Sequence, residues 1–218
     1  MIKWVLILNL SFLCYSFGFC QEGINVTDSN GLRQGVWKEK VNEENIVRIV
    51  SNYLNGEKHG ELKAYYENDK IAVIAQFNKG ELNGRVKNFY DNGKLKFEGY
   101  YLNGKKHGIF KEYWSNAKRK SVKQYCSDKI CGNYYEYYEN GKINVNVSES
   151  KENIEIWKIY HENGKLKLEG KKKKQTNIGD WMEYSEKGKL IKIFTYKSGK
   201  VVRERTFTKK VLIKDESF

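Results

Sequence analysis

Histidine and acidic residues are the side chains of this sequence that could hold a metal ion or perform acid–base catalysis. His59 and His107 stand at the same position of a repeating pattern, two repeats apart, and His161 is the third histidine. Two repeats of a flat sheet span four strands, roughly 19 Å, so these two histidines cannot share a metal ion. The sequence therefore predicts no metal site.

Four acidic residues directly precede a turn asparagine, and this position explains them without catalysis, because such side chains accept local backbone hydrogen bonds. They are Glu67, Asp91, Glu139 and Glu162. A paired-carboxylate hydrolase needs two carboxylates in one pocket, whereas a repeat spaces equivalent residues apart. The sequence contains no nucleophile elbow, phosphate-binding loop or dinucleotide fingerprint. We therefore expect a protein that is not an enzyme and that binds no cofactor.

The first twenty residues resemble an export signal. A short basic start, Met1–Lys3, is followed by an apolar stretch to Phe19, and Gly18 and Cys20 have the small-residue spacing of a cleavage site. A membrane anchor is the alternative, although the apolar stretch is shorter than the roughly 20 residues that span a bilayer. We expect residues 1–20 to be removed and the protein to be exported to the periplasm, the outer envelope or the medium.

Removal of the signal leaves Cys126 and Cys131 as the cysteines of the mature chain. Exported proteins fold under oxidising conditions, and these cysteines flank an expected hairpin turn, so a local disulfide is one interpretation. Two unpaired thiols at strand ends are the other, because the disulfide needs a cross-strand geometry that the sequence does not reveal.

An internal repeat organises the rest of the chain. A glycine recurs at steps of 23 to 25 residues, with Glu155 in place of one member; the glycines are Gly35, Gly60, Gly84, Gly108, Gly132 and Gly179. A large apolar residue follows two positions later, as in Phe110, and an aromatic residue follows five positions later, as in Tyr113. Three columns with one period identify true repeats.

Each repeat also contains a second turn signal half a period later, as in Asn92-Gly93 and Asn140-Gly141. Asn-Gly is the preferred sequence of a two-residue type I′ hairpin turn. Between the turns, apolar and polar residues alternate with the period of a β-strand, as in Leu95–Tyr101. Each repeat is therefore predicted to form two antiparallel strands joined by tight turns.

These patterns predict an all-β fold: one elongated, single-layer antiparallel meander of about seven repeated β-hairpins, with roughly fourteen strands between residues 28 and 205. The domain is expected to cover residues 21–205 and to be followed by a basic C-terminal cap or tail, residues 206–218. The degraded terminal repeats are typical of caps that prevent pairing at the sheet edges.

The run Tyr101–Trp114, with Asn103-Gly104 and Gly108, and the run Tyr138–Lys142 resemble the bacterial variant of the MORN repeat. The resemblance covers roughly residues 28–200. It implies consecutive β-hairpins and an interaction or membrane-associating scaffold, and some bacterial members resemble the antitoxin of YwqK-type toxin–antitoxin modules. Departures at Asp69, Ala117, Glu155 and the polar stretch Asn144–Asn153 predict local irregularity of the sheet.

Two features could form a binding surface. The first is the aromatic column, whose members are Tyr65, Tyr113, Tyr137, Tyr160 and Tyr184. The second is the net charge of +13, because residues 164–218 hold 16 Lys and Arg against 7 Asp and Glu, densest at Lys171, Lys172, Lys173 and Lys174. Such charge attracts acidic proteins, anionic lipid or glycan, whereas export argues against nucleic acid as a partner. Both features also have structural explanations, as a cross-strand ladder and as edge-guarding lysines.

The sequence thus favours an exported, non-enzymatic scaffold that binds a protein partner, antitoxin- or immunity-like by resemblance. The alternative is a cell-envelope module that binds anionic lipid or glycan through its basic C-terminal quarter. The sequence leaves the partner, the curvature of the sheet and the oligomeric state open.

Overall fold

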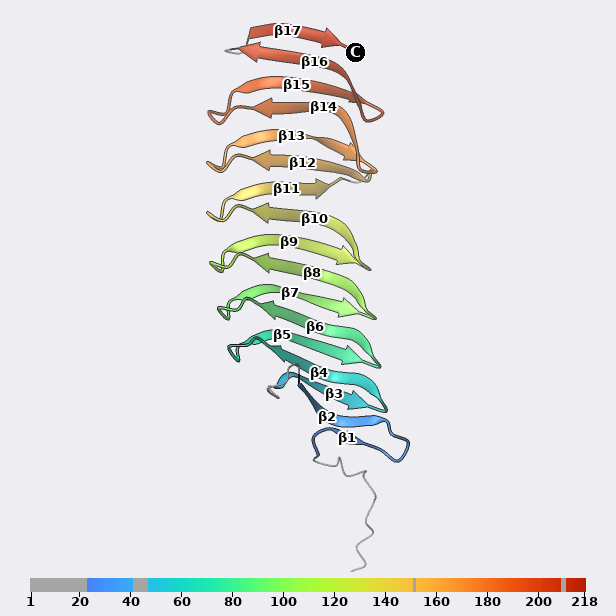
Figure 1. Cartoon of the computed structure of the whole chain (residues 1–218). Helices are drawn as coiled ribbons and strands as arrows, with labels where there is room; N and C mark the ends of the chain where they lie inside the picture. The colour runs from blue at the N-terminus through green and yellow to red at the C-terminus, as the bar shows by residue number, and fades with distance from the viewer. Residues whose placement is uncertain (1–22, 41–46, 151, 209–210) are drawn as a thin grey trace, which may run out of the picture.

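The computed structural model describes residues 23–40, 47–150, 152–208 and 211–218, so the expected signal, residues 1–20, lies outside the described residues. The described chain forms one open antiparallel sheet of 17 strands, in which each strand pairs with its neighbours in the sequence (Figure 1). The all-β meander is therefore confirmed, with three more strands than expected.

The strands have the following bounds: β1 Val26–Thr27, β2 Arg33–Lys40, β3 Val47–Leu54, β4 Glu57–Tyr65, β5 Ile71–Asn78, β6 Glu81–Phe89, β7 Leu95–Leu102, β8 Lys105–Tyr113, β9 Arg119–Cys126, β10 Lys129–Tyr137, β11 Ile143–Glu149, β12 Ile154–Tyr160, β13 Leu166–Lys173, β14 Thr176–Tyr184, β15 Leu190–Lys197, β16 Lys200–Thr208 and β17 Val211–Ser217. Most are seven to nine residues long, as the half-period of the repeat requires.

One row of turns consists of two-residue loops. Both loop residues have positive φ, for example 50° and 73° at Asn103-Gly104, which defines type I′ and matches the twist of the flanking strands. A turn of this row is also bonded to the hairpin before it, since the Gly104 N–H donates to the Leu82 carbonyl of β6. The row therefore stays aligned along the stack.

The opposite row, which includes Asn92-Gly93, is not of the expected two-residue type. The Gly93 N–H donates to the Tyr90 carbonyl, the Tyr90 N–H donates to the Lys94 carbonyl, and only Gly93 of the pair has positive φ. These bonds define a type I turn followed by a left-handed residue. The prediction was wrong because the same dipeptide fits both turns, with Asn in the right-handed region in one and the left-handed region in the other.

The column glycines do not mark turns either. Gly60, Gly84 and Gly108 lie inside β4, β6 and β8, where the register shifts against the preceding strand. Their φ angles are 86°, 128° and 77°, so each glycine is the left-handed residue of a β-bulge. The bulges fall at the same place in every regular repeat, and the strands are visibly curved (Figure 1).

The stretch Asn144–Asn153 is more regular than expected. Asn144–Glu149 belong to β11, which pairs with β10 and β12. The departure lies in the turn that follows, where the Ser150 N–H donates to the Ile154 carbonyl and the Asn153 N–H to the Ser150 carbonyl. A wider loop thus replaces a two-residue turn.

The C-terminal segment is part of the sheet. The domain boundary expected at residue 205 falls within β16, and β17 pairs antiparallel with β16 along its length. Residues 211–217 are therefore the last described strand of the sheet and not a tail outside it.

A single sheet has no interior, and its packing lies on one face. The buried apolar side chains all belong to rows that the strand register places on the same face; they are Tyr53, Ala75, Val86, Phe110, Val147 and Trp181. We call this the aromatic face. We call the opposite face, which carries Lys63, Lys87 and Lys111, the charged face.

Candidate functional site

The centre of the aromatic face is a row in which large and small residues alternate from strand to strand. Trp37 pairs with Ser51, Leu62 with Ala75, and Trp157 with Gly170. The glycines are needed where the rings are largest, because a Cβ on Gly99 would lie 2.3 Å from the Phe110 ring and one on Gly170 would lie 2.1 Å from the Trp181 ring. The structural role that a cross-strand ladder implies therefore accounts for Phe110 and Trp181, which are 6% and 4% exposed.

A second aromatic row lies opposite the bulge glycines. Its members are Tyr53, Phe77, Tyr101, Tyr125 and Tyr196, which pair with Gly35, Gly60, Gly84, Gly108 and Gly179. The two rows meet edge to face, with ring centroids 5.1 Å apart for Phe110 and Tyr125. Cations lie over the rings, among them Lys106 at 5.0 Å from the Tyr125 centroid.

The second row is interrupted at the level of β11, β12 and β13. Glu149 and Lys172 stand where the regular repeats have aromatic residues, and Glu155 stands where they have the bulge glycine. Glu149 pairs directly with Glu155, and Glu155 pairs directly with Lys172. Three positions in two columns thus change together in adjacent repeats, and charged side chains replace apolar surface.

A groove of about 1060 Å³ lies at this interruption. We call it the Trp157 groove; it is lined by Lys106, Tyr125, Asp128, Lys129, Ile130, Gly132, Tyr134, Glu149, Glu155, Trp157, Lys172 and Gln175. Tyr134 and Trp157 meet edge to face at 5.9 Å. The groove thus combines aromatic surface with carboxylates and lysines.

The polar groups of the groove are held in place by contacts. The Trp157 Nε1–H donates to Glu155 Oε2 at 2.8 Å, and Lys172 Nζ lies 3.8 Å above the Trp157 centroid. Burial, helped by the negative charges of Glu136 and Glu155, raises the pKa of Tyr134 to about 12, so its hydroxyl remains a neutral hydrogen-bond donor. Two carboxylates directly opposite each other destabilise the sheet, and a cationic ligand would relieve this repulsion.

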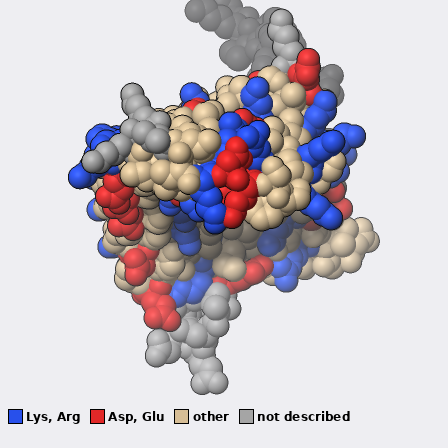
Figure 2. All heavy atoms as spheres, turned by 90° about the horizontal axis from the view of Figure 1, so that it is seen from above, with Lys and Arg blue, Asp and Glu red and all other residues tan. Residues whose placement is uncertain are grey.

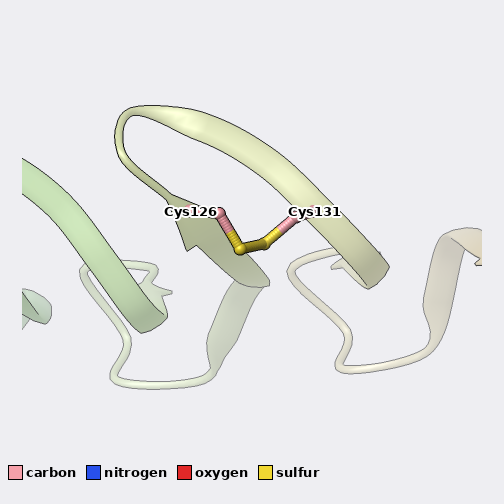
Figure 3. The surroundings of a disulfide bond; sticks show 2 residues. All are labelled: Cys126 and Cys131. Atoms are coloured by element: carbon pink, nitrogen blue, oxygen red, sulfur yellow. A yellow bond between two sulfur atoms is a disulfide. The ribbon is translucent and has the colours of Figure 1, made fainter.

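The disulfide closes a turn that lines this groove. Cys126 and Cys131 are bonded across the β9–β10 turn with their Cα atoms 5.8 Å apart, as Figure 3 shows. The residues between them include Asp128, Lys129 and Ile130 of the groove lining. Of the two interpretations of the cysteines, the structure contains the disulfide.

The predicted tyrosine column lies at the strand ends beside the wider turns, and its members do not converge. Tyr113 Oη donates to Glu98 Oε1 at 3.2 Å, and Tyr184 Oη donates to Glu169 Oε1 at 2.9 Å. Tyr137 lies under Arg119, whereas Tyr65 and Tyr160 pair with Ile71 and Leu166. All five are half-buried, so they form a line along one border of the sheet.

Five residues beside this column have a role that the sequence analysis missed. The side chain of each donates a hydrogen bond to a backbone carbonyl one repeat later: Tyr66 to Phe89, Tyr90 to Tyr113, Trp114 to Tyr137, Tyr138 to Tyr160 and His161 to Tyr184. The turn asparagines form a parallel ladder, as in Asn68 to the Asp91 carbonyl at 2.9 Å. The sequence contains a signal for this role, because each of these donors stands six residues after the column glycine or, for His161, after Glu155.

The predicted lysine block is divided between the two faces. Lys172 lies on the aromatic face, whereas Lys171 and Lys173 alternate to the charged face and Lys174 lies in a two-residue turn with a φ of 50°. The four lysines therefore do not form one patch. A lysine column on the charged face was missed, although it stands three residues after the column glycine; it comprises Lys38, Lys63, Lys87, Lys111 and Lys158.

Within the described part of the chain, no group of three or more His, Cys, Asp or Glu could hold a metal ion. The described residues also include no helix that is long and apolar enough to cross a membrane.

The repeats of this sheet match a known family. The model of the MORN repeat variant matches residues 58–79, 82–103, 130–147, 156–171 and 178–198. These five segments of the chain are variant MORN repeats. Each matched segment covers a β-hairpin or most of one. The hairpin of β8 and β9 lies between the second and third matched segments, and its first strand carries the same columns at Gly108, Phe110 and Tyr113. The matches run across the Trp157 groove, so the groove is an altered part of a MORN array. No curated protein matches the sequence.

Proposed function

We propose that this MORN repeat protein is a non-enzymatic scaffold that binds a protein partner along its aromatic face, with the Trp157 groove as the anchoring point. The observation that carries the proposal is the joint replacement of two aromatic residues and one bulge glycine by Glu149, Lys172 and Glu155. An array that served only as a spacer would gain nothing from opposing two carboxylates on its packed face.

The chemistry of the groove indicates the kind of side chain that would enter it. A lysine or arginine of the partner would lie between Glu149 and Glu155 and against the ring of Tyr134. The interaction between a cation and the face of an aromatic ring is favourable, and it becomes stronger when the cation is removed from water. A partner that presents a basic side chain from an extended segment or a loop fits this arrangement.

The setting of this function is also a proposal. Export is supported by the apolar N-terminal segment and by the Cys126–Cys131 disulfide, because disulfides persist in oxidising compartments. An antitoxin- or immunity-like role rests on the resemblance to YwqK-type proteins and on a surface suited to a protein. In that role the scaffold would cover a partner that acts in the envelope or outside the cell.

The proposal is tested by crosslinked affinity purification from the native envelope fraction, with washes at low and at high salt. The informative variant is Glu149→Tyr with Lys172→Tyr, which restores the aromatic column and fills the groove. We expect the wild type to retain one protein at near-equal stoichiometry through high salt and the variant to lose it. The variant should still fold, because Glu149→Tyr removes the opposed pair of carboxylates, and circular dichroism checks this.

The matched control is Lys63→Ala with Lys87→Ala, which removes two cations from the charged face and leaves the groove intact. Retention of the same protein by the groove-filled variant would refute the groove as the anchor. Recovery of lipid or glycan alone, lost at high salt, would refute the protein-binding scaffold.

The lysine column of the charged face favours a second candidate, a surface module that docks on anionic lipid or glycan. Its lysines on β2, β4, β6 and β8 recur at every second strand, roughly 10 Å apart, and therefore present a line of positive charge. Binding through this line would be lost at high ionic strength. It would also be lost in the Lys63→Ala, Lys87→Ala variant and kept in the groove-filled variant.

A further inference from the structure

The two edges of the sheet are finished differently. At the N-terminal edge, β1 pairs with β2, and the Asn25 side chain continues the pairing: its Oδ1 accepts the Lys38 N–H at 2.7 Å and its Nδ2 donates to the Lys38 carbonyl at 3.2 Å. At the other edge, no described strand pairs with the outer side of β17. An uncovered edge is a template for another strand.

One hydrogen bond shows which backbone groups of β17 point away from the sheet. The Phe218 N–H points inward and donates to the Val202 carbonyl of β16 at 2.8 Å. Backbone groups alternate in direction along an antiparallel strand, so those of Ser217 and Asp215 point away from the sheet. These groups are available to a further strand.

The charges of β17 are self-complementary about Asp215. Lys214 and Glu216 flank it on the aromatic-face side and form an ion pair with each other at 2.6 Å. Antiparallel pairing of β17 with a second copy, centred on Asp215, places each Lys214 opposite Glu216 of the other copy. Opposite charges directly across strands are stabilising.

The centre of this arrangement is also compensated. The two Asp215 residues face each other, but Arg203 Nε donates to Asp215 Oδ1 at 2.7 Å, and Arg205 pairs directly with Asp215 across β16 and β17. Two carboxylates therefore meet among four guanidinium groups. Figure 2, which looks down on the β17 end of the stack, shows basic and acidic side chains beside one another rather than a surface of one sign.

We propose that β17 is a self-pairing edge through which two copies of this chain form an antiparallel dimer with one continuous sheet. The two-fold axis passes between the Asp215 residues and stands perpendicular to the sheet, so both aromatic faces lie on the same side. Association also shields exposed apolar side chains near the edge, because Leu212, Ile213 and Phe218 are 46%, 59% and 73% exposed. A closed isologous contact uses up the free edge and prevents further growth.

Charge reversal tests this register directly by light scattering coupled to size-exclusion chromatography. The wild type should have the mass of two chains. Lys214→Glu and Glu216→Lys should each weaken dimerisation roughly tenfold or more, since like charges then face each other twice. An equimolar mixture of the two variants should dimerise again, because the two acidic side chains of one variant then face the two basic side chains of the other.

Two further variants control for folding and for surface charge. Ser217→Pro removes an outward N–H that β16 does not use, and it should abolish the dimer while the circular dichroism spectrum stays unchanged. Lys197→Glu, at the exposed end of β15, should leave the dimer intact. A monomeric wild type at about 100 µM, or a mixture of the two charge variants that stays monomeric, would overturn the proposal.

Discussion

At the scale of single residues, the sheet is stabilised by close approach rather than by an enclosed core. Gly170 lies under the Trp181 ring, and Gly99 lies under the Phe110 ring. A ring that lies flat over a strand is shielded from water on that side without a second layer. Glycine on the neighbouring strand is therefore as important as the aromatic residue itself.

Gly170→Ala is expected to lower the free energy of unfolding by roughly 1–3 kcal/mol, because its Cβ would displace the Trp181 ring. Urea denaturation followed by tryptophan fluorescence measures this change. In a Trp181→Leu background the same substitution should cost less, because the smaller side chain leaves room. Equal costs in the two backgrounds would contradict the close contact.

Ala117→Gly is expected to raise the free energy of unfolding by about 1 kcal/mol. Ala117 has a φ of 70° at a turn position that is glycine in four of the six equivalent turns, and the left-handed region strains every residue with a Cβ. Thermal denaturation of the variant tests this. Ala72→Gly, at the second residue of β5, is the control and should instead be destabilising.

At the scale of elements, the sequence predicts the hairpins better than it predicts their turns. Strand alternation and the repeated columns were enough to assign the meander between residues 28 and 205. They could not distinguish a bulge glycine such as Gly108 from a turn glycine, because both need positive φ. Nor could they assign Asn92-Gly93, whose dipeptide suits two loop types.

The candidate site was less predictable than the fold. Glu155 was recognised as the missing glycine, but the sequence does not show which residue of the next strand faces it. The register supplies that information: it places Glu149 and Lys172 on either side of Glu155 and distributes the run Lys171–Lys174 over two faces. The periodicity of the sequence was therefore enough to predict the repeat, whereas the position of the altered site could be determined only from the pairing of the strands.

The β9–β10 hairpin should depend on its disulfide. Replacing both cysteines, Cys126→Ser with Cys131→Ser, is expected to lower the free energy of unfolding by roughly 2 kcal/mol, because a short loop loses its constraint. Hydrogen exchange should accelerate at residues 126–131, with little change beyond the neighbouring hairpins. Acceleration spread evenly over the whole sheet would contradict a local staple.

At the scale of the whole molecule, the described strands pair only with their neighbours in the sequence, so stability is mainly a sum of local terms. A repeat can be removed if the new neighbours are compatible. Deletion of residues 57–80 joins Gly56 to Glu81 and preserves a two-residue turn; it brings Ser51 opposite Val86 in place of Leu62. We expect this variant to fold, with a longest dimension by X-ray scattering about 10 Å shorter.

Deletion of residues 81–104 is the contrasting case, although it removes the same number of residues. It brings Ala75 opposite Phe110, where the protein has Gly99 and where a Cβ would lie 2.3 Å from the ring. This variant should unfold at a lower urea concentration than the first deletion. Equal stability of the two would show that the alternation of large and small residues does not decide which repeats can be neighbours.

The side-chain ladder along the wider turns has a direction. Tyr66, Tyr90, Trp114, Tyr138 and His161 each donate forward, to a carbonyl that the ribosome makes about 23 residues later. A chain that emerges from its N-terminus thus holds a donor ready for each new hairpin, and no finished hairpin has to reopen. The order of synthesis and the order of assembly can therefore be the same, as the export proposed above would favour.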